Sequence, residues 1–273
     1  MSSAERPIGI FDSGVGGLTV LAAIQQALPR ERLFYFGDSA HIPYGDRSLR
    51  EVRAFSAAIA RALLGKGCKL VVIACNTASA AALHELRTAY PHTLFVGMEP
   101  ALKPAAERSR SKVVGVIATR ATFQGKLFAS VMERFAQDIE VLEQPCPGLV
   151  QAIEAGELDT PSTEALLRAW LEPMLAKGMD ELVLACTHYP YVRPLIERLV
   201  GPMVEVIDPA PAVARQVGRL LGEKGLLSSA LPTRPIAWTS GDPQAFGALT
   251  ERLGAPQLDV RSAHWAHGEL NLP

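Results

Sequence analysis

Short apolar runs alternate with longer amphipathic segments along this chain, and this alternation constrains the fold more than any other feature of the sequence. Such alternation is typical of α/β proteins. Several runs are apolar at consecutive positions, as expected for strands of a parallel sheet that helices cover on both faces. The runs predict nine strands, over residues 8–11, 33–36, 70–74, 94–97, 113–118, 139–142, 182–185, 204–207 and 235–239. A helix is predicted over residues 50–64, where apolar residues recur at three- and four-residue steps, with Gly65 as its stop.

The second half of the chain repeats motifs of the first half. Val-Val-Ile-Ala-Cys-Asn-Thr at Val71–Thr77 returns as Leu-Val-Leu-Ala-Cys-Thr-His at Leu182–His188. Gly-Ile-Phe-Asp, ending at Asp12, is matched by Gly-Val-Ile-Ala, ending at Ala118. This self-similarity indicates a duplicated α/β unit. We therefore expect two similar α/β domains with mainly parallel sheets, related by a pseudo-two-fold axis, and an active site in the cleft between them.

The two copies of the repeat lie in different halves of the chain, with Asp12 and Cys75 in the first and Cys186 in the second. The 273 residues are enough for two domains of moderate size, and no charge-rich linker separates the two halves.

Charge and composition exclude several classes of partner. The 27 basic residues are balanced by 28 acidic ones, so no nucleic-acid partner is expected. The start of the chain lacks the apolar core of a signal peptide, and no apolar run approaches the roughly 20 residues of a membrane span. The four cysteines contain no C-x-x-C pair, which favours reduced thiols in a cytoplasmic protein.

Cys75 and Cys186 carry the main chemical prediction. Each follows an apolar strand run and precedes a predicted helix start, where Asn76-Thr77 and Thr187-His188 would supply capping side chains. Ligands of open α/β sheets bind at the carboxyl ends of strands, and a helix N-terminus there favours a thiolate. Two thiols on opposite sides of a carbon suit a two-base reaction that removes a proton from one face and returns one to the other. The alternative is that both are small buried core residues.

Other motifs are more ambiguous. The run from Asp12 to Gly17 misses a dinucleotide-binding loop, because Thr19 replaces the third glycine of G-x-G-x-x-G. Asp12 could serve the cleft or act as a helix N-cap. Pro43-Tyr44-Gly45 could present backbone donors to a ligand or form only a turn. His188 could assist Cys186 or be structural. The histidines near Cys186 and at the C-terminus do not combine into a ligand set, so no metal is expected.

These motifs together resemble the glutamate racemases of the cofactor-independent aspartate/glutamate racemase family. The resemblance covers nearly the whole chain in collinear order, and it rests on these segments: Gly-Ile-Phe-Asp12-Ser13-Gly-Val-Gly-Gly, Tyr-Phe-Gly-Asp38, Pro43-Tyr44-Gly45, Ala-Cys75-Asn76-Thr77-Ala, Ala-Cys186-Thr187-His188-Tyr-Pro and Thr-Ser-Gly-Asp242-Pro. It implies a racemase without a cofactor that interconverts L- and D-glutamate and supplies D-glutamate for peptidoglycan synthesis. It also implies that the C-terminal segment completes the first domain, so that residues 1–98 with 209–273 form the first domain and residues 99–208 form the second.

The resemblance also implies roles for individual residues. Cys75 and Cys186 match the acid–base thiols, Asp12 and His188 match the groups that assist them, and Glu154 resembles a further assisting acid. The substrate-binding positions that it implies are Asp12, Ser13, Asp38, Pro43, Tyr44, Gly45, Cys75, Asn76, Thr77, Thr119, Thr122, Cys186, Thr187 and His188. Members that need a cell-wall precursor as activator share a longer N-terminal segment than the seven residues before Ile8, so such activation is not expected here.

Three alternatives stay open from the sequence. The same thiol pair would serve a racemase of aspartate or of a broader substrate set. A binding or regulatory protein could retain a vestigial racemase site. A pyridoxal-phosphate enzyme would need a lysine in a strand-end motif, and no lysine occupies one as closely matched as the cysteines. The substrate is expected to be a small molecule, and a homodimer is an open alternative for the assembly.

Overall fold

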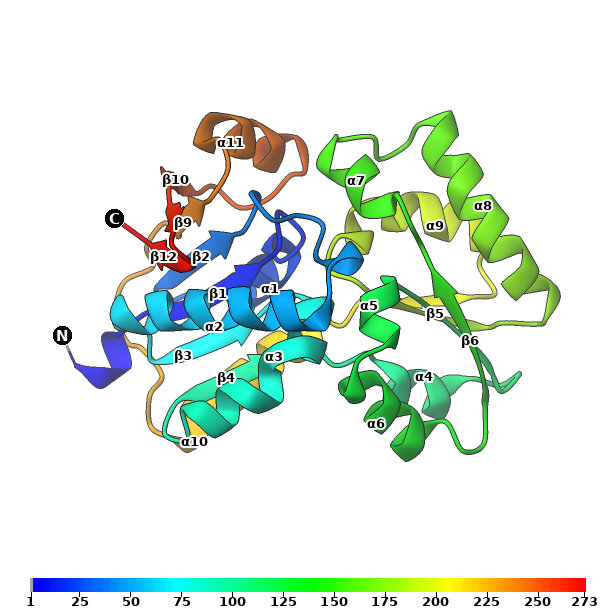
Figure 1. Cartoon of the computed structure of the whole chain (residues 1–273). Helices are drawn as coiled ribbons and strands as arrows, with labels where there is room; N and C mark the ends of the chain where they lie inside the picture. The colour runs from blue at the N-terminus through cyan, green and yellow to red at the C-terminus, as the bar shows by residue number, and fades with distance from the viewer. Residues whose placement is uncertain (1) are drawn as a thin grey trace.

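The alternating sequence pattern gives two parallel sheets in a computed structural model that describes residues 2–273 (Figure 1). The larger sheet has the strand order β10-β9-β2-β1-β3-β4, and every neighbouring pair in it is parallel. Its strands are β1 (Ile8–Asp12), β2 (Leu33–Gly37), β3 (Leu70–Ile73), β4 (Leu94–Gly97), β9 (Ile236–Thr239) and β10 (Asp259–Ser262). The chain thus leaves this sheet after β4 and returns to it with β9.

The smaller sheet has the order β6-β5-β7-β8 and is also parallel throughout. Its strands are β5 (Val113–Ala118), β6 (Glu140–Pro145), β7 (Glu181–Ala185) and β8 (Glu205–Ile207). The order 2-1-3-4 of the first four strands therefore recurs as 6-5-7-8. This repeated topology supports the predicted duplication, and the two sheets form the two lobes of Figure 1.

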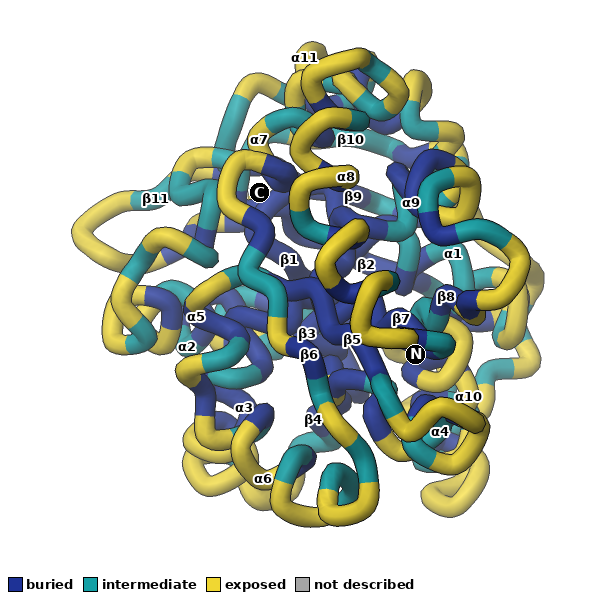
Figure 2. The backbone as a smooth tube through the Cα atoms, turned by 90° about the vertical axis from the view of Figure 1, so that its right-hand side faces the viewer, coloured by how far each residue is buried: buried dark blue, intermediate teal, exposed yellow. Residues whose placement is uncertain are grey.

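Helices cover both faces of each sheet, so each sheet lies between two apolar cores. In β1, Ile8 and Ile10 belong to the core on the side of α1 and α10, whereas Phe11 belongs to the core on the side of α2 and α3. Figure 2 shows the result: the buried backbone lies along the central strands, and the exposed backbone lies in the surrounding helices and loops. The helices of the larger unit are α1 (Leu18–Ala27), α2 (Leu49–Gly65), α3 (Asn76–Ala89), α10 (Ala210–Glu223) and α11 (Pro243–Arg252).

The smaller sheet is covered in the same manner. Its two cores include side chains of α8 and α9 on one face and of α4 and α6 on the other. The helices of this region are α4 (Leu102–Arg108), α5 (Arg120–Phe123), α6 (Lys126–Phe135), α7 (Leu149–Glu154), α8 (Pro161–Ala176) and α9 (Arg193–Val200). Short 3-10 helices occupy η1 (Ser3–Glu5), η2 (Tyr44–Asp46) and η3 (Tyr189–Val192). Within residues 2–273 no helix has the length and apolar character to cross a bilayer.

All nine predicted strands are present, with bounds that differ by a few residues. The predictions missed β10 and the antiparallel hairpin of β11 (His264–Ala266) and β12 (Glu269–Asn271). The predicted helix at residues 50–64 is α2, which starts with a capping box between Ser48 and Glu51. The helix ends at Gly65, as predicted, and Gly67, with a φ of 83°, makes the left-handed turn after it.

Candidate active site

The two repeated cysteine motifs meet at one cavity between the two sheets. Cys75 follows β3 and Cys186 follows β7, so each thiol lies at the carboxyl end of a central parallel strand. The cavity is small. Its lining comes from both units: Ser13, Pro43, Tyr44, Gly45, Cys75, Asn76 and Thr77 from one, and Thr119, Val150, Cys186, Thr187 and His188 from the other.

Cys75 caps helix α3 with its own side chain. Its Sγ accepts a hydrogen bond from the backbone N–H of Ala78 at 3.5 Å, so the prediction that Asn76 and Thr77 supply the cap was wrong. Burial raises the pKa of the Cys75 thiol well above its usual range, and the charge of Asp12 raises that pKa further. The hydrogen bond from Ala78 lowers the pKa but does not outweigh these effects. The expected preference for the thiolate is therefore reversed in the ligand-free site.

Cys186 has different neighbours. No α-helix begins directly after it. The 3-10 helix η3 starts at Tyr189, and neither Thr187 nor His188 makes the predicted side-chain cap. Instead, Nδ1 of His188 lies 4.0 Å from Sγ of Cys186, and Nε2 of the same ring lies 2.7 Å from Oε1 of Glu154. The structure thus places the predicted assisting residues in a row: Glu154 contacts the His188 ring, and the other side of that ring faces Cys186.

His188 is buried and carries a raised pKa. Burial by itself lowers the pKa of this imidazole, but the neighbouring Cys186, Glu154 and Asp12 together raise it well above its usual value. The raised pKa favours the protonated ring, which can share a proton with the sulfur beside it.

Asp12 is the last residue of β1 and comes directly before the glycine-rich loop. Its Oδ2 accepts a 2.7 Å hydrogen bond from the N–H of Gly17, the residue before α1, so Asp12 also has part of the capping role considered from the sequence. Its Oδ1 is buried without a partner among the described residues. Burial raises the pKa of this carboxyl, and the charge of His188 opposes the rise.

The glycine-rich loop contacts the other unit. The N–H of Val15 donates to Oε1 of Glu154 at 3.0 Å. A Cβ atom at Gly14 would overlap that carboxylate, and a Cβ atom at Gly16 would overlap the ring of His188. The glycines of this loop therefore permit close packing against Glu154 and His188, which gives them a role unlike that of a dinucleotide-binding loop.

Three hydroxyls join the units beside the cavity. Oγ1 of Thr77 lies 2.9 Å from Oγ1 of Thr119, which in turn lies 2.9 Å from Oγ1 of Thr122. Asn76 is also at the cavity, and both polar atoms of its buried amide lack a partner among the described residues. Because a buried unpaired amide is costly, these atoms indicate a polar ligand in the cavity.

Most predicted substrate-binding residues line the cavity, but three of them, Asp12, Asp38 and Thr122, lie behind its wall. The hydroxyl of Thr122 contacts the hydroxyls of Thr77 and Thr119. The carboxylate of Asp38 accepts a hydrogen bond from the hydroxyl of Tyr44. The cavity wall also includes Val150, which the sequence reasoning missed. Val150 lies one helical turn before Glu154 in α7, and this spacing could have predicted that the two face the same side.

A wider hollow adjoins the cavity. The two share Pro43, Gly45, Thr119 and Val150 as lining residues, and the hollow is lined further by Arg47 and Arg120. A small molecule can therefore approach the thiols through a hollow that contains two cationic side chains. No group of three or more His, Cys, Asp or Glu within residues 2–273 is arranged to hold a metal ion.

The fold defines an α/β protein, and its candidate site lies between two parallel-sheet units. The family model of the Asp/Glu/Hydantoin racemases matches residues 8–217, and the chain belongs to that family. It is 50% identical over 260 residues to the glutamate racemase of Ectopseudomonas mendocina (strain ymp), which covers 95% of this chain and 99% of the relative.

Solved structures give the same relationship. A glutamate racemase isoform from Bacillus anthracis superimposes with a TM-score of 0.89 at 31% identity and covers 97% of this chain and 99% of its own. A glutamate racemase from Francisella tularensis subsp. tularensis SCHU S4, solved in complex with D-glutamate, has a TM-score of 0.83 at 31% identity and covers 95% and 97% of the two chains.

Proposed function

We propose that this protein is a glutamate racemase that works through Cys75 and Cys186 without a cofactor. The observation that carries the proposal is that these thiols, from equivalent positions of two repeated units, line one buried cavity. The names of the relatives and the D-glutamate in a solved relative support glutamate as the substrate.

The proposed reaction uses the thiols in turn. One thiolate takes the α-proton of glutamate and becomes a thiol, and the electron pair stays on the α-carbon. The opposite thiol then protonates the other face of that carbon and becomes a thiolate. Each turnover inverts the centre and moves one proton from one sulfur to the other, so the reverse reaction starts from the state in which the forward reaction ends.

The surroundings of the two sulfurs suit this exchange. Asp12 lies near Cys75, and the Glu154–His188 pair leads to Cys186. We assign to Asp12 and His188 the task of adjusting the protonation of the thiol beside each of them. Glu154 is a positioning residue, because its carboxylate holds the His188 ring from the side opposite to Cys186.

The carbanion-like state and the two carboxylates of glutamate need fixed donors. The helix start at Asn76 and the start of η2 at Tyr44–Gly45 offer backbone N–H groups that no intrahelical bond uses. The unpaired amide of Asn76 and the hydroxyls of Ser13, Thr77, Thr119 and Thr187 line the same cavity. We assign these groups to the substrate carboxylates. D-Glutamate supply for peptidoglycan synthesis is the biological role that we propose.

Incubation with L-glutamate in D₂O, without added cofactor, tests the proposal. We expect circular dichroism to decay to zero. Proton NMR measures the total loss of the α-proton from both enantiomers, and at early times this loss should equal the inversion recorded by circular dichroism. The L-glutamate remaining at that time should still carry its proton, because substrate and product exchange through different thiols. Early loss of the α-proton from L-glutamate without inversion would contradict the two-thiol mechanism, and absence of any turnover would contradict the proposed activity.

A further inference from the structure

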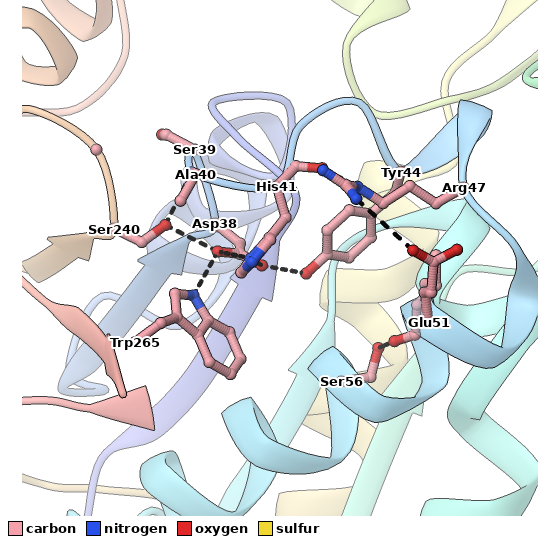
Figure 3. Close-up of polar contacts among 12 residues, drawn as sticks. Asp38, Ser39, Ala40, His41, Tyr44, Arg47, Glu51, Ser56, Ser240 and Trp265 are labelled. Atoms are coloured by element: carbon pink, nitrogen blue, oxygen red, sulfur yellow. Dashed lines mark hydrogen bonds and ion pairs between the residues drawn. The ribbon is translucent and has the colours of Figure 1, made fainter. Parts of the chain in front are cut away.

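A buried carboxylate behind the cavity wall collects four donors (Figure 3). Oδ2 of Asp38 accepts from the hydroxyl of Tyr44 at 2.6 Å and lies 2.9 Å from Nδ1 of His41. Oδ1 accepts from Oγ of Ser240 at 2.8 Å and from Nε1 of Trp265 at 2.8 Å. The side chain of Asp38 is fully buried, so these donors replace the water that a carboxylate would otherwise bind.

The donors come from three distant segments of the chain. His41 and Tyr44 belong to the loop after β2, Ser240 follows β9, and Trp265 lies in β11. Asp38 therefore ties the C-terminal hairpin to the loop that carries Tyr44, which lines the cavity.

Aromatic contacts join the same segments. The His41 ring stacks on Phe55 of α2 at a centroid distance of 4.0 Å, and the Trp265 ring meets both at their edges, 5.1 Å from His41 and 5.8 Å from Phe55. Tyr44 packs against Phe55 at 5.8 Å. These aromatic contacts fix the position of the Trp265 indole, whose N–H donates a hydrogen bond to Asp38.

Tyr44 depends on this arrangement for its orientation. Its one hydroxyl proton is given to Asp38, so the carboxylate fixes the ring on the cavity wall and, with it, the backbone of Tyr44 and Gly45. Hydrogen bonds to a buried charged acceptor are worth more than ordinary ones, and loss of one donor leaves the acceptor free to shift toward those that remain.

We propose that Trp265, a residue of the C-terminal hairpin that does not line the cavity, is a positioning residue for substrate binding. It acts through Asp38 on Tyr44 and so holds the loop at Pro43–Gly45 against the substrate. The inference rests on the proposed function, because it concerns the binding wall of the same site.

The substitution Trp265→Phe tests this inference, since it keeps an aromatic ring but removes the N–H. Trp238→Phe is the matched control: Trp238 is a buried indole of β9 whose Nε1 has no hydrogen-bond partner among the described residues. We expect Trp265→Phe to raise KM for glutamate at least about fivefold with kcat changed less than about twofold. Trp238→Phe should leave KM near that of the wild type.

A double-mutant cycle separates positioning from general loss of structure. In a Tyr44→Phe background the hydroxyl that links to Asp38 is gone, so Trp265→Phe should raise KM by less than about 1.5-fold more. An equal increase of KM in both backgrounds, or a wild-type KM in Trp265→Phe, would overturn the inference.

The accessibility of the cysteines can be measured without turnover, so it tests the role of Trp265 independently of the proposed racemase activity. Iodoacetamide labelling, quantified by peptide mass spectrometry, should modify Cys75 and Cys186 at least about threefold faster in Trp265→Phe than in the wild type or Trp238→Phe. Cys68, buried in the core behind β1, is the internal control. Unchanged labelling of Cys75 and Cys186 would refute the positioning role, whereas absent turnover in the wild type would refute the racemase activity alone.

Discussion

The two sulfurs of this site have unequal surroundings although their reaction must be symmetric. Cys75 lies by a carboxylate, and Cys186 lies by an imidazole held by Glu154. L- and D-glutamate have the same free energy in water, so the equilibrium constant for racemisation is one. The value of kcat/KM must therefore be equal in the two directions for every variant. Only kcat and KM taken separately can reveal the asymmetry of the two sides.

This constraint sharpens the prediction for the thiols. We expect Cys75→Ser and Cys186→Ser each to lower kcat/KM by about 10³-fold or more, equally for both enantiomers, because a serine hydroxyl is a poor base and acid at neutral pH. Polarimetric assays from both enantiomers measure this effect. Cys68→Ser, in the apolar core, is the control and should keep kcat/KM near that of the wild type. Ready turnover in either active-site variant would remove the basis for a two-thiol mechanism.

At the residue scale the sequence could identify most residues that line the cavity, but it could not distinguish them from residues that lie behind the cavity wall. Cys75, Cys186 and His188 occupy repeated motifs, and motif identity was enough to bring them to one cavity. Asp38 carries an equally distinctive motif, yet it contacts Tyr44 from behind the wall. Nothing in its neighbours along the chain reveals that Ser240 and Trp265 reach it from more than 200 positions away.

At the element scale, apolar runs locate strands where the strands are buried on both sides. The central strands β1, β3 and β7 are buried throughout, whereas β6 and β8, at the edges of the smaller sheet, are mixed in polarity. Strand β10 was missed because Asp-Val-Arg-Ser is short and mixed in polarity, and its pairing with β9 at the sheet edge places it there. The glycine-rich loop between β1 and α1 was readable as a turn, but its contact with His188 and Glu154 depends on the position of the second unit.

That contact makes Gly16 a test of how the loop and the second unit fit together. A Cβ atom there would overlap Nδ1 of His188 and crowd Oγ1 of Thr187, both of them buried. We expect Gly16→Ala to lower kcat/KM at least about tenfold, or about 1.4 kcal/mol in transition-state stabilisation. Gly65→Ala is the control, because a Cβ atom on this last residue of α2 meets nothing within 4 Å. It should leave kcat/KM unchanged and slightly raise stability. Wild-type kcat/KM in Gly16→Ala would show that the loop can move without consequence.

Strand β7 contains a carboxyl that should make stability depend on pH. Burial raises the pKa of Glu181 to about 7, and the charge of Glu205 on the neighbouring strand adds to the rise. The folded state then holds this proton more tightly than the unfolded state, whose carboxyl titrates near its ordinary value of 4.5. The resulting stabilisation is complete below about pH 4.5 and is lost as the pH rises through about 7.

Glu181→Gln should remove this part of the pH dependence. We expect its free energy of unfolding to exceed that of the wild type by about 1 kcal/mol at pH 8, and the advantage to shrink toward pH 4.5. Urea unfolding at both pH values measures it. Glu133→Gln, which removes the same charge from an exposed position of α6, should show no such gain. A gain of equal size at both pH values would exclude the titration of Glu181 as the cause.

At the scale of the whole molecule, the repeated strand order places equivalent strand ends from two units around one cavity. The family assignment and the sheet topology support this arrangement. We propose residues 1–98 with 209–273 as one domain and 99–208 as the other, since the strands of the larger sheet lie within the first set and those of the smaller sheet within the second. A substrate that contacts both units should then stabilise the molecule as a whole.

The last prediction uses this coupling to decide substrate choice without turnover. In the Cys75→Ser variant the enantiomers are not expected to interconvert, so each can be tested as a ligand. At 100 times its Kd, glutamate should stabilise the fold by about 2.7 kcal/mol. Discrimination against aspartate must come from its shorter side chain, which places the distal carboxylate short of donors such as Thr187 and Asn76 and leaves them unpaired.

If aspartate binds about tenfold more weakly, the same concentration should stabilise the fold by only about 1.4 kcal/mol. The melting temperature should then rise with either enantiomer of glutamate, and exceed that with aspartate by about 2 °C. Differential scanning calorimetry measures both shifts, with succinate as a dicarboxylate that lacks the amino group. Equal shifts for aspartate and glutamate would keep the two-thiol site but assign it a broader substrate. A shift for succinate as large as that for glutamate would indicate that the site holds carboxylates without recognising the α-centre.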